Sequence, residues 1–430
     1  MAKNTNISLR GLNIYQVFLR QHPNPTFSGL IKDLDRIKSL GMDIIYLCPF
    51  HPIGEVHRKG SVGSPYSIKD YKAIDPIHGT LDDFKEFINE THKMGLKVMM
   101  DIVFHHASHD NIKRNTHQEW FYKKEGIITT KVPDWSDVID FDFQQPLVWD
   151  YLIDVLLFYT KLGVDGFRCD VASLVPVDFW IQARKEVKKI NPNAIFLGES
   201  IHLGFVKHLR DQGFEAHSDS ELYEAFDILY DYDIHHQMLN YLEHKDLNGW
   251  LEAILRQESV YPKNYVKLRN LENHDQLRIA HYFSDTNKLL NITALNFFLK
   301  GTTMIYMGQE YKETKTPSLF EIDSIDLTPR NMEIRNLIHR MSHLKKDSLF
   351  SNGAFKIHLQ EKEVAVISYE NNTSITYGIF NLGLENGTVE VNLKDGVYQN
   401  ILYPNQVKIH QKTLTLSEKP MILFSIKEHL

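Results

Sequence analysis

Hydrophobic and polar positions along the first three quarters of the chain repeat one small pattern: an amphipathic helix, then a glycine, then a short apolar run. The pattern occurs around Gly41, Gly95, Gly163 and Gly301. A glycine in this place suits the left-handed residue that ends a helix, and the apolar run after it suits a strand buried on both faces. The repeat therefore predicts the helix-to-strand connections of a parallel sheet.

The apolar runs predict eight strands that alternate with helices. We place them near residues 12–18, 43–48, 96–104, 164–170, 194–199, 225–230, 266–272 and 302–307. This arrangement favours an α/β fold, a closed (β/α)₈ TIM barrel over residues 1–350. Its chemistry is expected on the loops at the C-terminal ends of the strands.

Two connections are too long for simple turns. Residues 49–80 are rich in Gly, Pro and Ser, and loops of this length are more often functional than idle. Residues 107–145 form a short insertion after the third strand, with aromatic residues at 120–122 and at Trp135. We interpret the insertion as a wall of the barrel mouth, and 120–122 as its small core rather than as a ligand platform.

The pattern changes near residue 351 to short alternating runs broken by Asn-Gly and Asp-Gly turns. Such runs predict an all-β C-terminal domain, a β-sandwich over residues 351–430. We expect it to cover one side of the barrel and to add stability.

Composition narrows the class of protein. Hydrophobic residues make up 43% and charged residues 24% of the chain, and the net charge is -7, which gives no reason to expect a nucleic acid or an anionic membrane as a partner. Because no segment resembles a signal peptide or a membrane span, we expect a cytoplasmic protein. Cys48 and Cys169 fall on predicted interior strands, which excludes a disulfide framework and a zinc motif. The oligomeric state is undetermined.

The stretch LGVDGFRCD, residues 162–170, is the centre of the predicted chemistry. Alternation along its strand places Arg168 and Asp170 on one face and Cys169 on the other. A guanidinium beside a carboxylate lowers its pKa, which suits a carboxylate that attacks carbon. The alternative is a structural ion pair at a strand end.

Polar side chains follow four of the predicted strands, at the end where a barrel carries its chemistry. They are Asp101, His106, Arg168, Asp170, Glu199, His274 and Asp275. Carboxylates that converge there would repel one another and raise at least one pKa. Cleavage of a glycosidic bond needs such a set, because one carboxylate attacks the anomeric carbon and another donates a proton to the leaving oxygen.

Four ordered segments, DIVFHH, GFRCDVAS, FLGES and LENHDQ, resemble the signature regions of the α-amylase family of glycoside hydrolases. The resemblance implies Asp170 as the nucleophile, Glu199 as the general acid/base and Asp275 as the third carboxylate, which holds sugar hydroxyls. It also implies a set of substrate-binding residues, Tyr66, Asp101, His106, Arg168 and His274. In the family pattern, Tyr66 would stack on the sugar at the cleavage point, although loop packing is an equally good explanation of this tyrosine.

The sequence departs from the family pattern at residues associated with calcium binding and with the preference for one type of glycosidic linkage. His105 stands where the family often has an Asn calcium ligand, and Ser173 and Leu174 replace a Lys-His pair near the same site. Asp140 does match a calcium carboxylate, but one carboxylate does not make a site. We therefore predict no metal or cofactor requirement. Val171, directly after Asp170, does not decide between a preference for α-1,4 bonds and a preference for α-1,6 bonds.

Two other classes of protein agree less well with the sequence. A metal-dependent amidohydrolase needs a His-x-His pair, which is absent, and His105 and His106 are expected to point to opposite faces of a strand and so not to share an ion. A non-catalytic accessory or binding relative would be expected to carry a membrane anchor or to lack part of the carboxylate set, whereas this sequence shows no membrane span and has all three carboxylates.

The sequence thus predicts a retaining glycoside hydrolase that cleaves α-glucosidic bonds of malto-oligosaccharides or starch-type α-glucans through a covalent glycosyl-enzyme. An α-glucosidase of the oligo-1,6 type and a glucanotransferase are the alternatives. The short insertion further predicts an open cleft with few strongly defined sugar subsites, so that short chains are used readily.

Overall fold

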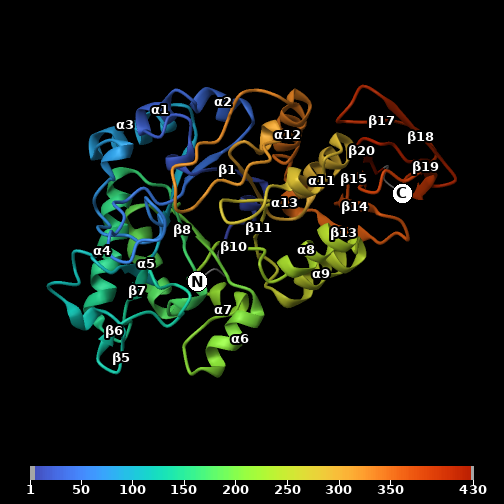
Figure 1. Cartoon of the computed structure of the whole chain (residues 1–430). Helices are drawn as coiled ribbons and strands as arrows, with labels where there is room; N and C mark the ends of the chain where they lie inside the picture. Colours follow the sequence, from blue (N-terminus) through green and yellow to red (C-terminus); the bar gives the residue numbers. More distant parts are fainter. Residues whose placement is uncertain (1–4, 428–430) are drawn as a thin grey trace.

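The computed structural model describes residues 5–427, and its centre is a closed barrel of eight parallel strands (Figure 1). The strands follow one another around the barrel in chain order, and the last pairs with the first. They are β1 (Asn13–Val17), β2 (Ile44–Leu47), β3 (Lys97–Ile102), β8 (Gly166–Cys169), β9 (Ile195–Gly198), β10 (Ile228–Tyr230), β11 (Lys267–Arg269) and β12 (Thr302–Tyr306). Each lies within a predicted range, so the predicted TIM barrel is confirmed.

Helices surround the barrel and connect successive strands. They are α1 (Phe27–Ile31), α2 (Leu34–Ser39), α3 (Leu81–Lys93), α4 (Pro146–Leu162), α5 (Val177–Ile190), α6 (Leu203–Asp211), α7 (Asp219–Leu222), α8 (His235–His244), α9 (Leu247–Val260), α10 (Ile279–Tyr282), α11 (Thr286–Phe298), α12 (Met332–Leu344) and α13 (Ser348–Asn352). The predicted glycine cap is clearest at Gly163, which ends α4 in the left-handed conformation with φ 106°. A side chain there would be strained, so glycine fixes the turn from α4 into β8.

Two apolar layers hold the barrel. Inside it, side chains such as Ile44, Met99, Leu197 and Met304 form one buried cluster, while the outward faces of the strands pack against the helices in a second, larger cluster. Cys169 belongs to the outer cluster, as the predicted alternation requires. The strands are therefore buried on both faces, and polar side chains can gather only where the strands end.

The insertion after β3 has its own small sheets. β4 (His106–Ser108) pairs with β7 (Val138–Asp140), and β5 (Lys123–Lys124) pairs with β6 (Ile127–Ile128). Trp120 and Phe121 are buried, and Phe121 stacks on Phe141 with ring centroids 5.0 Å apart. The interpretation of this aromatic cluster as a small core is confirmed for Trp120 and Phe121.

The C-terminal part is all β, as predicted, with two four-stranded antiparallel sheets that enclose an apolar cluster. One sheet contains β13 (Ala354–His358), β14 (Val364–Glu370), β15 (Ser374–Asn381) and β20 (Met421–Ile426). The other contains β16 (Thr388–Glu390), β17 (Gly396–Gln399), β18 (Gln406–His410) and β19 (Thr413–Thr415).

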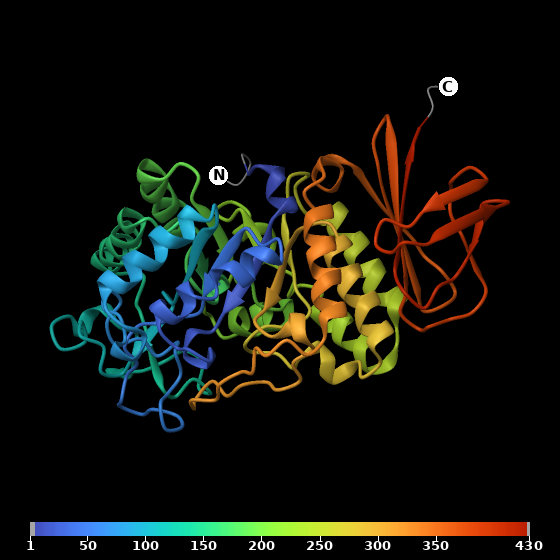
Figure 2. The same cartoon turned by 90° about the horizontal axis from the view of Figure 1, so that it is seen from above.

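The first of these sheets lies against the helices of the barrel (Figure 2). The ring of Phe298, at the end of α11, packs on Tyr369 and Phe380, and the hydroxyl of Tyr369 donates to the carbonyl of Phe298 at 3.0 Å. The expectation that this domain covers one side of the barrel is therefore confirmed. Over residues 5–427, no helix combines the length and the apolar character needed to cross a membrane.

Candidate active site

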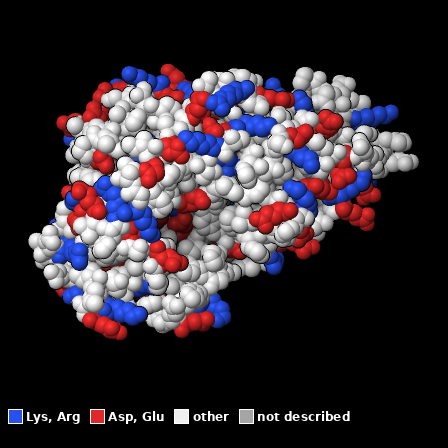
Figure 3. Space-filling view, viewed as in Figure 1, with Lys and Arg blue, Asp and Glu red and all other residues white. Residues whose placement is uncertain are grey.

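Five of the eight predicted site residues line one cavity at the C-terminal ends of the barrel strands, and the other three, Asp101, Arg168 and His274, contact them. The cavity has a volume of about 300 Å³, and its lining includes Tyr66, His106, Asp170, Glu199 and Asp275. Figure 3 shows the molecular face hollowed near its middle, with acidic side chains beside the hollow. The sequence motifs therefore come together in space as they were predicted to.

A single buried arginine holds three of the carboxylates. Arg168 on β8 is 1% exposed, and its Nη1 lies 2.9 Å from Asp101 Oδ1 and 2.8 Å from Asp170 Oδ1. Its Nη2 lies 2.8 Å from Glu199 Oε1. The register explains this convergence, because Asp101 on β3 is the direct strand partner of Arg168, and Glu199 follows β9 on the other side.

Burial decides the protonation of these carboxyls. It raises the pKa of Asp170 well above its usual range, and Glu199 and Asp101 add to this rise while Arg168 opposes it. Burial likewise raises the pKa of Glu199 and of Asp101 against the effect of Arg168. Arg168 does act to lower the pKa of Asp170, as predicted, but burial and the two neighbouring carboxyls outweigh it and the net shift is upward, because one guanidinium is shared by three desolvated carboxyls. The arrangement favours a proton retained among the three.

The third predicted catalytic carboxylate, Asp275, has a different environment. Its side chain is 40% exposed, and its Oδ2 lies 3.0 Å from Nε2 of the buried His274. Burial acts to raise the pKa of Asp275, but the charge of His274 outweighs this and lowers it. Burial would lower the pKa of His274, and the charge of Asp275 reverses this and raises it well above the usual value. Asp275 is thus an ionised carboxylate with its own cation.

Tyr66 joins the two halves of the site. Its hydroxyl donates to Asp101 Oδ2 at 3.0 Å and contacts His274 Nε2, and its ring stacks on the ring of His274 with centroids 5.4 Å apart. Gln16 on β1 contacts the other nitrogen of His274 at 2.9 Å. Packing within the site therefore fixes the tyrosine ring that lines the cavity.

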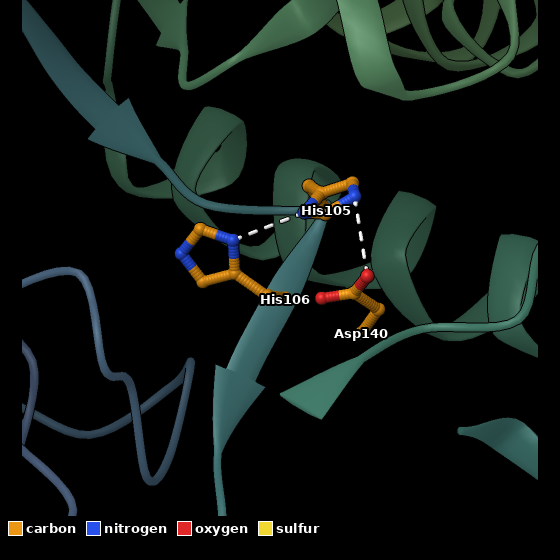
Figure 4. A group of neighbouring side chains, drawn as sticks. All are labelled: His105, His106 and Asp140. Carbon is orange, nitrogen blue, oxygen red and sulfur yellow. Dashed lines mark hydrogen bonds and ion pairs between the residues drawn. The ribbon is translucent and has the colours of Figure 1, made fainter. Parts of the chain in front are cut away.

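His106 lines the cavity from the insertion side, and behind it lie His105 and Asp140 (Figure 4). Nδ1 of His105 lies 3.1 Å from Nδ1 of His106, and Nε2 of His105 lies 3.5 Å from Asp140 Oδ2. Burial lowers the pKa of His106 to about 4 and raises that of Asp140 to about 6. The expectation that the two histidines point apart is wrong, because His105 lies between β3 and β4, outside either strand, where alternation does not apply.

His105, His106 and Asp140 are the residues closest to a metal site in the structure. Within residues 5–427, they form the one group of His, Cys, Asp and Glu side chains whose ligand atoms lie within 4.8 Å of one another. Calcium takes six to eight oxygen ligands, and here two of the three donors are nitrogens. Asp140 Oδ2 accepts from the backbone of Lys131 at 2.7 Å, so Oδ1, which is buried and has no hydrogen-bond partner, is the one unengaged carboxylate oxygen of the group. The group does not fit calcium.

We therefore predict that activity does not require calcium. Dialysis against EDTA should leave both the turnover and the melting temperature essentially unchanged, because His105, His106 and Asp140 offer two nitrogens and a single carboxylate where calcium needs six to eight oxygens. The measurements are activity and thermal unfolding before and after dialysis. A large loss of either one, restored by calcium but not by sodium, would contradict the prediction and make Asp140 a ligand.

Sequence reasoning missed Trp135 as a site residue. Its half-buried ring lies 5.4 Å from the ring of His106, centroid to centroid, and it lines the cavity at Asp170. The sequence grouped it with the aromatic residues of the insertion. No local signal in the sequence separated it from them, because Val132 and Val138 flank it and it also packs against a small apolar cluster with Val132, Leu174 and Ile201.

A second, wider cavity of about 790 Å³ adjoins the first. The two share Glu199, Asp275, Trp135 and Val171, but Asp170, Tyr66 and His106 line only the first. The wall particular to the wider cavity is largely apolar and comes from the segments around α6 and α8, with residues such as Ile201, Leu203, Phe205 and Leu239. The site is therefore a cleft that consists of a narrow and a wide cavity, which share Glu199.

Comparison with known proteins gives the same assignment over nearly the whole chain. Residues 20–139 and 134–354 match the family model described as the α-amylase catalytic domain, and residues 356–423 match the bacterial α-amylase C-terminal domain.

Relatives and solved structures extend the comparison. A probable oligo-1,6-glucosidase 2 of Bacillus subtilis (strain 168) is 25% identical over 74% of this chain and 68% of its own length, and a maltogenic α-amylase of Bacillus acidopullulyticus is 26% identical over 74% of this chain and 55% of its own length. An α-amylase structure from Lactobacillus plantarum is 39% identical, covers 98% of this chain and all of its own, and superposes with a TM-score of 0.94. A noncanonic maltogenic α-amylase from Thermotoga neapolitana is 32% identical with the same coverage and a TM-score of 0.87.

Proposed function

The chain belongs to the α-amylase family of glycoside hydrolases, and from this premise we propose that it cleaves α-glucosidic bonds of malto-oligosaccharides or starch-type α-glucans with retention of configuration. The observation that carries the proposal is the trio of carboxyls bound to Arg168 at the floor of the cavity. A purely structural ion pair would need one carboxylate for one cation, whereas this site holds an excess of acid groups.

The reaction assigns a different role to each carboxyl. An oxygen of Asp170 attacks the anomeric carbon, the bond to the leaving oxygen breaks, and that oxygen takes the proton of Glu199. Glu199, now ionised, then takes a proton from water, whose oxygen attacks the anomeric carbon and releases Asp170. Asp275, His274, His106 and Tyr66 bind the hydroxyls and the ring face of the attacked sugar, while Arg168 and Asp101 hold the carboxyls in place.

The position of the two reacting carboxyls supports retention. Retaining enzymes separate them by about 5–5.5 Å and inverting enzymes by 6.5–9.5 Å. Asp170 and Glu199 each lie 2.8 Å from a nitrogen of the same guanidinium, which keeps them close together. Glu199 Oε2 also accepts from the backbone of Val171 at 2.8 Å, next to Asp170.

We predict that the first sugar released has the α configuration. The test is incubation with maltoheptaose, isomaltose and pullulan, with the products identified over time and the anomer of the first product read by NMR. Cleavage of maltoheptaose would support an α-1,4 preference, and faster cleavage of isomaltose would favour the oligo-1,6 alternative. Longer products that accumulate at high substrate concentration would indicate a glucanotransferase. A β anomer as the first product would contradict retention.

A non-catalytic accessory role is the second candidate from another class. The complete carboxyl set and the buried Arg168 argue against it, because sugar binding alone requires neither a protonated carboxyl nor a nucleophilic carboxylate beside it. A cytoplasmic location stays a prediction from the sequence.

A further inference from the structure

We propose that the cleft is closed on the nucleophile side by Lys59 and Phe320, so that the enzyme cleaves near the non-reducing ends of short α-glucans rather than within long chains. This inference rests on the proposed function and concerns the substrate that the same site accepts.

The narrow and the wide cavity of the cleft differ in the carboxyls that line them. The narrow cavity contains Asp170, which must reach the anomeric carbon of the attacked sugar. The wide cavity contains Glu199 without Asp170, and Glu199 must reach the oxygen that leaves. The narrow cavity therefore holds the glycosyl part on the non-reducing side, and the wide one holds the leaving part.

Lys59 lines the narrow cavity and not the wide one. It belongs to the loop after β2, and its Nζ lies 2.8 Å from Asp137 Oδ1 and 2.9 Å from the Asp134 carbonyl, both in the insertion. Asp137 is 6% exposed and lines the same cavity. The Lys59 side chain is 36% exposed, whereas this carboxylate is largely out of solvent, so loss of Lys59 would leave a buried carboxylate without its cation.

A third segment supports the same loop from the other side. The Phe320 carbonyl accepts from the backbone of Val62 at 3.1 Å, and Glu321 Oε1 accepts from the backbone of Ser61 at 3.0 Å. Gly60 has φ 66°, and a Cβ there would lie 2.6 Å from Phe320 Cβ, so only glycine permits this approach. Phe320 itself lines the cavity.

Arg20 fixes the two loops to each other. It is 3% exposed, and its Nη1 donates to the Gly63 carbonyl at 3.0 Å while its Nη2 donates to the Leu319 carbonyl. Lys59, Trp135 and Phe320, from three linked segments, form a rim of the narrow cavity, and Trp135 lines the wide cavity as well. The narrow cavity has a volume of about 300 Å³, which is at the small end for ligand sites. Such a rim leaves room for the end of a chain and obstructs a chain that continues.

The experiment compares two maltoheptaosides that differ only at the non-reducing end, one free and one blocked with a ketal, with 4-nitrophenyl α-glucoside as a small reference substrate. The wild-type enzyme should cleave the free compound at least ten times faster than the blocked one, and its first products from the free compound should be glucose or maltose. Equal rates on the two maltoheptaosides, with the small substrate cleaved, would overturn the inference and leave the proposed function intact. No cleavage of any of the three would overturn both.

A variant of the bridge sharpens the test. Lys59→Ala should raise the rate on the blocked compound relative to the free one by about tenfold and lengthen the first products, since the bridge to Asp137 is lost. Lys69→Ala is the matched control, because Lys69 pairs with Glu55 and Asp110 nearby but lines neither cavity, and its rate ratio should equal that of the wild type. Equal rate ratios in the folded Lys59→Ala variant and the wild type would show that Lys59 does not close the cleft.

Discussion

Asp170→Asn is expected to remove nearly all turnover, by roughly 10⁴-fold or more, while the protein stays folded. An amide is too weak a nucleophile to form the glycosyl-enzyme, yet it has almost the shape of the carboxylate it replaces. Its oxygen can still accept from Arg168 Nη1, which also keeps its contact with Asp101. The measurements are kcat on maltoheptaose and the melting temperature of the purified variant.

Cys169→Ser is the matched control one residue away. Cys169 is fully buried and belongs to the cluster between the barrel and its helices, on the face of β8 opposite to Arg168. A hydroxyl there disturbs packing but reaches no substrate, so much of the turnover should remain. If Asp170→Asn kept more than a few per cent of wild-type kcat, the proposed nucleophile would be wrong.

The fold and the centre of the site could be predicted because both follow from local patterns. The glycines at helix ends and the apolar runs after them define the strands, and the carboxyl ends of parallel strands meet at one end of a barrel. Once β3, β8 and β9 were placed, the meeting of Asp101, Arg168 and Glu199 followed from the order of the strands alone. No side-chain contact had to be known.

Other features depend on burial and on loop paths, which a single sequence does not encode locally. The net rise of the pKa of Asp170 was not predicted, because alternation gives the neighbour, Arg168, but not the loss of solvent around three carboxyls. The orientation of His105 was wrong because alternation was applied beyond the end of β3.

The rim of the narrow cavity is the clearest example. Lys59, Trp135 and Phe320 come from three irregular segments that are far apart in the sequence, and none lies at a strand end. Their meeting is fixed by hydrogen bonds such as those of Arg20 to the Gly63 and Leu319 carbonyls. Loops of this kind decide which substrate enters, while the strand ends decide the chemistry, so the reaction was easier to predict than its substrate length.

Asp275→Asn separates binding from proton transfer and serves as the control for the last prediction. Asp275 is ionised beside His274 and is proposed to hold sugar hydroxyls, a contact that any glycosyl substrate makes. Its removal should therefore slow substrates with good and poor leaving groups by similar factors. Wild-type rates on both would contradict that role.

Glu199→Gln should instead lower the rate in a way that depends on the leaving group. For maltoheptaose, whose leaving oxygen needs a proton, kcat/KM should fall by about 10²–10⁴-fold. α-Glucosyl fluoride, whose fluoride leaves without a proton from the enzyme, should still form the glycosyl-enzyme at a substantial rate.

The pH dependence should change in the same variant. Burial and the charge of Asp275 raise the pKa of Glu199 against the effect of Arg168, so the wild-type Glu199 stays protonated to higher pH than an exposed glutamate would, and kcat/KM falls as the pH rises through the pKa of Glu199. Glutamine has no proton to lose, and this alkaline fall should vanish in the variant while the fall at low pH, where Asp170 becomes protonated, remains. If the fall of kcat/KM at high pH persisted unchanged in Glu199→Gln, the group that protonates the leaving oxygen would not be Glu199.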